Sequence, residues 1–277
     1  MFKKLLKHDF ISVSKILFPI LISVIIISIL GVLDIFFMKE IFTKDGNTIS
    51  VLLNIISVIA FVFIIFALII ATAGTQVVIY YNFYKTLLTD EGYLTFTLPV
   101  KPQSIILSKL LNATIWTIIT SLVIILCIIF MLITAFYSDM KEIWEDFTLL
   151  TQIFSEFEMP LDGFAIIILY IILSIALFAF TQLLYFVAMF IGANGSKKNK
   201  GLSAIVCIFI ANFILSTGSS IIMSIIAIFS SAISTFFSNP LATLYIMLSI
   251  MIFFLAVATV GLFFFLKHSM EKNLNLP

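Results

Sequence analysis

Long uncharged apolar stretches alternate with short charged segments along the whole chain. A helix needs about 20 apolar residues to span the hydrocarbon core of a bilayer, and six stretches reach that length. The six predicted spans are residues 16–37, 51–80, 110–137, 164–191, 202–229 and 241–266. We therefore predict an all-α integral membrane protein, with residues 1–277 forming a single transmembrane domain.

Two segments need a separate interpretation. Residues 1–15 mix lysines with apolar residues at helical spacing, which predicts an amphipathic elbow helix at the membrane surface. The apolar run that follows is too long for a signal peptide and has no small-residue cleavage site. Residues 202–237 carry no charge and are too many for one span at about 1.5 Å per residue. Residues 216–220 (STGSS) are a candidate kink in this stretch. We expect residues 230–239 to fold back as a re-entrant hairpin before span six.

The lysines predict the orientation. Twelve of the fifteen lie in the N-terminal segment, in segment 82–109, in the loop 192–201 and in the C-terminal tail. The loop 138–163 on the opposite side holds seven Asp or Glu residues and one lysine. Because cytoplasmic loops are enriched in lysine, we predict a multi-pass cell-membrane protein with both termini and segment 82–109 in the cytoplasm.

Composition excludes most soluble and catalytic functions. The chain is 62% hydrophobic and 10% charged, so it lacks the polar residues that cover a soluble domain. Its two histidines are far apart, and no sequence cluster is suited to zinc. The glycine spacing of the loop 192–197 does not match a phosphate-binding loop. We therefore expect no enzyme activity, no cofactor or metal, and no nucleic-acid partner for this chain.

Few polar residues lie inside the predicted spans. Asp34 is the one acid within an apolar run, and its position near the outer end favours a carboxylate at the interface over a proton relay. The scarcity of such acids disfavours an ion-coupled carrier. Gly74, Thr75 and Gln76 are three consecutive small or polar residues in span two. They are our candidate lining of a substrate pathway, and hydrogen bonding between helices is the alternative.

Segment 82–109 is the longest charged break that also carries many aromatic residues. Span two is expected to continue as an amphipathic helix over residues 80–89 and to end at residues 90–92, and Pro99 and Pro102 stop further helix. An ordinary aromatic belt at the interface is one interpretation, and a binding surface for a cytoplasmic protein is the other. The residues expected to contact that partner are Tyr84, Leu87, Asp90, Glu91, Tyr93, Leu94 and Phe96.

The same segment resembles a known family. Residues 90–94 (DEGYL), 97–100 (TLPV) and 108–111 (SKLL) resemble the cytoplasmic loop after the second span of type-two, or ABC-2-like, bacterial ABC exporter permeases. Residues 5–10 (LLKHDF) are similar to the elbow helix of these permeases. Permeases of the G subfamily carry a large external region before the last span. In this chain the largest predicted external loop, residues 138–163, instead lies between spans three and four.

The resemblance implies a function and a set of partners. Segment 82–109 would be the coupling helix that docks on a separate cytoplasmic ABC ATPase, present in two copies that bind ATP and Mg. The chain would be a permease subunit that exports an amphiphilic substrate in a lipid membrane, paired with a second permease, either identical or a related paralogue. A membrane sensor or immunity protein that binds an external peptide without transport is the alternative, and an ion-coupled secondary carrier is the third.

The acidic loop 138–163 is the predicted external surface for cargo. Aromatic residues are interleaved with its carboxylates, and carboxylates attract a cationic amphiphile over a Debye length of about 8 Å in physiological salt. A solvated cap without a ligand is the simpler interpretation. Peptide or bacteriocin, drug and lipid all remain open as cargo, with a cationic peptide preferred. The candidate contacts are Glu142, Trp144, Glu145 and Asp146.

Overall fold

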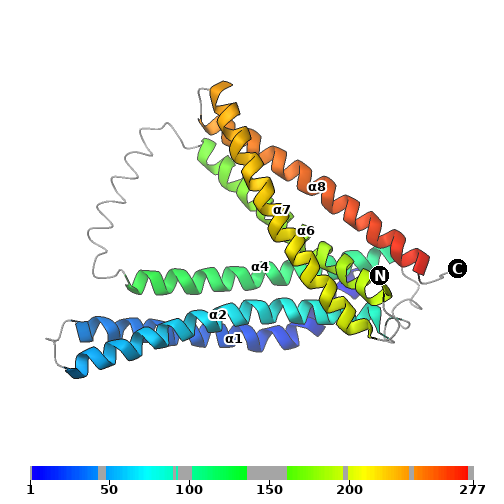
Figure 1. Cartoon of the computed structure of the whole chain (residues 1–277). Coiled ribbons are helices and arrows are strands. Elements are labelled where there is room, and N and C mark those ends of the chain that lie inside the picture. The colour runs from blue at the N-terminus through cyan, green and yellow to red at the C-terminus, as the bar shows by residue number, and fades with distance from the viewer. Residues whose placement is uncertain are drawn as a thin grey trace. The chain divides into compact units, whose positions relative to one another are not determined.

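The computed structural model is all-helical in the part of the chain that it describes. The described residues are 2–42, 48–89, 92, 102–135, 161–195, 199–236 and 240–273. The helices are α1 (Phe2–Phe42), α2 (Thr48–Leu88), α4 (Pro102–Ala135), α6 (Leu161–Gly195), α7 (Lys200–Phe236) and α8 (Pro240–Asn273) (Figure 1). Two of them begin at a proline, which suits the first helical position because its missing N–H has no partner there in any case.

All six helices are long and apolar enough to cross a membrane. Large apolar side chains lie exposed along them, including Phe63 and Ile70, each 69% exposed. In lipid an exposed apolar side chain carries no penalty, and a helix satisfies its own backbone hydrogen bonds. The prediction of an all-α, multi-pass membrane protein is thereby confirmed at this level.

The two segments that needed a separate interpretation are helical throughout their described residues. The elbow residues are continuous with span one in α1, which runs through Pro19. The expected re-entrant hairpin over 230–239 is wrong in its first part, because α7 stays helical to Phe236, and residues 237–239 lie outside the described residues. Residues 216–220 had suggested a kink. Their serine and threonine hydroxyls donate hydrogen bonds to backbone carbonyls three or four residues earlier in α7. Such bonds keep a polar side chain satisfied inside a continuous helix.

The chain divides into two compact units, and α1, α2 and α4 contribute to both. One unit comprises residues 10–79 and 116–159, which we call the three-helix unit. Its core joins α1, α2 and α4 through Val24, Val32, Ile35, Leu68, Cys127 and Met131. Gly31 lets α1 approach its neighbours there, since a Cβ at this position would lie 2.2 Å from Met131 Cε and 3.3 Å from Ile64 Cγ2.

The other unit comprises residues 1–9, 80–115 and 160–277, and we call it the junction unit. Within it α6 packs against both α7 and α8 (Figure 1). The helices α6 and α7 approach closely at Gly192, where a Cβ would lie 2.6 Å from the Ser203 carbonyl oxygen and 2.7 Å from Ala204 Cα. The two backbones therefore touch at a point where no side chain fits.

Candidate functional site

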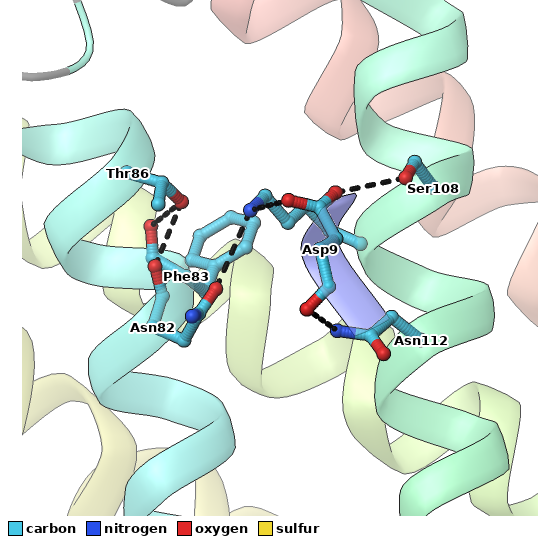
Figure 2. A network of polar contacts seen from close by, with 7 residues as sticks. Asp9, Asn82, Phe83, Thr86, Ser108 and Asn112 are labelled. Carbon is cyan, nitrogen blue, oxygen red and sulfur yellow. Dashed lines mark hydrogen bonds and ion pairs between the residues drawn. The ribbon is translucent and has the colours of Figure 1, made fainter. Parts of the chain in front are cut away.

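A buried ion pair lies at the centre of the junction unit. Lys109 Nζ on α4 is 2.6 Å from Asp9 Oδ1 on α1, and both side chains are less than a tenth exposed. The Ser108 hydroxyl donates to the other carboxylate oxygen, Asp9 Oδ2, at 2.8 Å. Each oxygen of the carboxylate therefore has its own donor from α4 (Figure 2).

Two asparagines extend the pair into a network. Lys109 Nζ also donates to Asn82 Oδ1 on α2 at 3.3 Å, and Asn112 Nδ2 donates to the Asp9 backbone carbonyl at 3.4 Å. Figure 2 shows the Thr86 hydroxyl one turn further along α2, where it donates to the Asn82 carbonyl at 2.7 Å. The Asp9–Lys109 network thus joins the beginning of α1, the end of α2 and the beginning of α4.

The energetics of this network favour one fixed arrangement. Removing a charge from water is costly, and a buried pair offsets that cost only if its remaining hydrogen bonds are satisfied. The bonds from Ser108 and to Asn82 meet this requirement. If either partner is lost, an uncompensated charge remains buried, so the three helix ends are held in a single register.

Aromatic stacking fixes the same end of α2 against α6. Phe83 and Phe186 stack with ring centroids 4.0 Å apart and an interplanar angle of 5°. Tyr80 and Tyr185 lie one turn away with centroids 5.1 Å apart. Such pairs add about 0.5–1.5 kcal/mol beyond the burial of their area. The end of α2 is therefore packed inside the junction unit on one side and linked to Lys109 on another.

The structure describes two of the seven residues that were predicted to contact a partner. Leu87 is buried at 5% exposure, so its side chain belongs to the core of the junction unit. Tyr84 is half-buried and lies beside Gly201, whose Cβ would be 3.4 Å from the tyrosine hydroxyl. The other five residues, Asp90, Glu91, Tyr93, Leu94 and Phe96, lie outside the described residues. Contact with a partner stays a prediction for all seven.

Gly92 closes the end of α2. Its N–H donates to the Thr89 carbonyl at 2.8 Å, and a Cβ would lie 2.6 Å from the Leu87 carbonyl oxygen. A side chain at this position would therefore clash with the backbone of the last turn of α2. The DEGYL motif thus has its glycine where the backbone lies close to the end of α2.

The candidate pathway residues lie on α2 in the three-helix unit. Thr75 is buried at 2% exposure, and its hydroxyl donates to the Thr72 carbonyl at 2.7 Å. Gln76 Nε2 lies 3.5 Å from Thr117 Oγ1 on α4. A Cβ added at Gly74 would meet open space. The bond from Gln76 is the interhelical contact that the alternative interpretation expects, and a substrate pathway stays a prediction.

The predicted cargo contacts Glu142, Trp144, Glu145 and Asp146 lie outside the described residues. Among the residues that the structure does describe, no group of three or more His, Cys, Asp or Glu side chains could hold a metal ion.

Sequence reasoning noted Asp9 and Lys109 separately, but not their pairing. One available signal was that a single acid stands among the lysines of the N-terminal segment. Its partner is 100 positions away in the sequence, and no local pattern links the two.

Comparison of the chain with known protein families, with curated proteins and with solved structures finds no match. The features that bear on function are therefore the six apolar helices, the Asp9–Lys109 network and the motif of segment 82–109.

Proposed function

We propose that this chain is the permease subunit of an ATP-driven ABC exporter that moves an amphiphilic substrate out of the cell. Two copies of a separate cytoplasmic ATPase would bind ATP and Mg, and a second permease would complete the transporter. The observation that carries the proposal is the Asp9–Lys109 network. It fastens the helix ends on both sides of the segment whose motif resembles a coupling helix.

To couple ATP hydrolysis to transport, a movement of this segment must be transmitted to the membrane-spanning helices. On one side of the segment, the end of α2 is stacked on α6 through Phe83 and bonded to Lys109 through Asn82. On the other side, the beginning of α4 is bonded to Asp9 of α1. A close-packed interior transmits strain rather than deforming gradually. A force applied by an ATPase would therefore move α1, α2, α4 and α6 together at this level.

The docking test asks first whether a gene for an ABC ATPase adjoins the gene of this chain, and then whether the two products co-purify. We expect Tyr93→Ala combined with Glu91→Lys to abolish co-purification, because interface aromatics often contribute about 2 kcal/mol or more each. The matched control changes the same residue types elsewhere, with Tyr170→Ala and Glu271→Lys. Tyr170 is 53% exposed and the Glu271 side chain 48% exposed. Normal recovery of the ATPase with the first double variant would contradict docking through segment 82–109.

The proposed orientation has its own test. In a background lacking Cys127 and Cys207, Trp144→Cys should react with an impermeant thiol reagent in intact cells, and Ser196→Cys should react only after lysis. Cys127 is part of the core of the three-helix unit, so alanine is a better replacement there than a polar residue. The reverse labelling pattern would place segment 82–109 outside the cell and would rule out an intracellular ATPase partner.

A further inference from the structure

Asp34 carries a buried carboxylate oxygen that the rest of the described structure leaves without a hydrogen-bond partner. The residue lies on α1 in the three-helix unit and is the one acid between residues 10 and 39. From the sequence we expected an interfacial carboxylate facing headgroups or water. The residue as a whole is partly exposed, so Asp34 reaches the protein surface while its Oδ2 is buried, and the interfacial position stays a prediction.

Other polar side chains of this unit show what a satisfied group looks like. The Ser28 hydroxyl, 4% exposed, donates to the Ile25 carbonyl at 2.7 Å. Thr75 likewise bonds back within its own helix. A hydroxyl can do so because it carries a proton to donate, whereas an ionised carboxylate only accepts. As a carboxylate, Asp34 would therefore need a donor from outside α1.

Local packing restricts the rotation of α1 near Asp34. Gly31 lies three residues before Asp34 and thus on the same side of α1. It is held against Met131 of α4 and Ile64 of α2, and the next residue, Ile35, belongs to the buried core. Rotating α1 to turn Oδ2 outward would break these contacts. A donor for Oδ2 would therefore approach from the side on which Asp34 is partly exposed.

The surroundings favour an organic cation over a metal ion. Hard metal cations take six or more oxygen ligands, and the described residues contain no acidic cluster that could supply them. A primary ammonium brings its own three donors and needs one carboxylate. The large apolar side chains Leu33 and Phe37, 48% and 61% exposed, flank Asp34 one turn apart on α1. They offer a surface for an alkyl chain next to the charge.

We infer that Asp34 is the counter-ion for the ammonium group of an amphiphile whose apolar part lies along Leu33 and Phe37. Calling this amphiphile the cargo depends on the proposed export function, whereas the binding itself does not. The cargo would then be a cationic amphiphile, which also suits the seven acids of the loop 138–163.

The test uses decylammonium as the probe and decanol as its neutral analogue. Binding to the purified chain in neutral-lipid nanodiscs is measured by calorimetry, with empty nanodiscs subtracted. We expect Asp34→Asn to weaken decylammonium binding about tenfold or more, because a buried charge loses its partner, and to leave decanol unaffected. Asp34→Glu should retain binding, and Glu271→Gln is the control for an exposed carboxylate. Unchanged decylammonium binding in Asp34→Asn would overturn the inference. The inference would also fail if decylammonium bound more weakly in a sodium salt than in a choline salt of the same concentration, because the site would then bind a metal cation.

A second measurement needs no variant and covers the case in which Asp34→Asn fails to fold. A hydrophobic carbodiimide should modify Asp34 of the wild-type chain, as seen by mass spectrometry, and decylammonium but not decanol should protect it. Absence of protection would contradict the site. Co-purification of the ATPase is scored on the same preparations. If the ATPase co-purifies but Asp34→Asn binds decylammonium like the wild type, the cation site is refuted and the exporter proposal is not. If Asp34 binds decylammonium but no ATPase co-purifies, the exporter proposal is refuted and the cation site is not.

Discussion

Replacing Lys109 with methionine should lower the free energy of unfolding by about 3–5 kcal/mol, because the carboxylate of Asp9 then stays buried without its cation. Asp9→Asn should cost a similar amount, since it leaves the ammonium group with Asn82 as its remaining described partner. The double variant should recover most of the loss, because a buried pair replaced by neutral groups of similar volume is often close to neutral in stability. Unfolding in mixed micelles, followed by circular dichroism, measures all four corners of the cycle.

The exposed pair at the other end of the chain is the matched control. Lys267 Nζ lies 4.0 Å from Glu271 Oε1, with the two side chains 24% and 48% exposed. Exposed i,i+4 pairs of this kind contribute about 0.3–0.5 kcal/mol. Lys267→Met and Glu271→Gln should therefore have small effects that add. If the Asp9 and Lys109 variants also added, with no recovery in the double variant, the two charges would not be coupled, and the network would not hold the three helix ends together.

Substituting Gly192 should be the next most damaging change. A side chain there meets the backbone of α7 at 2.6–2.9 Å, and backbone cannot move aside as a flexible side chain can. We expect Gly192→Leu to destabilise the fold by about 3 kcal/mol, at the upper end of ordinary overpacking, and Gly192→Ala to do so to a smaller extent. The melting temperature of the purified protein, with its gel-filtration profile, reports the loss.

Gly195 provides the control on the same helix. A Cβ at this position meets nothing within 4 Å. Alanine is a better helix former than glycine by about 0.5–1 kcal/mol, so Gly195→Ala should be neutral or slightly stabilising. Equal effects of Gly192→Ala and Gly195→Ala would show that the close approach of α6 and α7 does not exist in the membrane.

The contacts at the end of α2 were not predictable from the sequence motif. The motif of segment 82–109 directed attention to the end of α2, and Tyr84 and Leu87 do lie there. The sequence pattern suggested that both were available to a partner, yet Leu87 is buried within the junction unit. An aromatic face on a helix has the same pattern whether it packs on α6 or on another protein. Burial is decided by which elements meet.

The sequence by itself determined the membrane-spanning helices. Their existence depends on local run length and on the need of the backbone to bond internally in lipid, and neither depends on distant residues. The continuity of α7 is also local, since its hydroxyls bond within their own helix. There, however, the serines and glycine had suggested a kink.

Only the tertiary structure decided the pairings. Asp9 and Lys109 lie far apart in the sequence, and their contact arises because α1, α2 and α4 meet at one level. Gly192 and Gly195 are the same residue three positions apart, but one touches backbone and the other faces open space. Asp34 was visible as a lone acid, but its buried oxygen depends on the packing of α1 against α2 and α4. Hydropathy depends on each residue alone, whereas a contact depends on two segments and their relative register, which is why the sequence pattern predicted the helices and not the contacts between them.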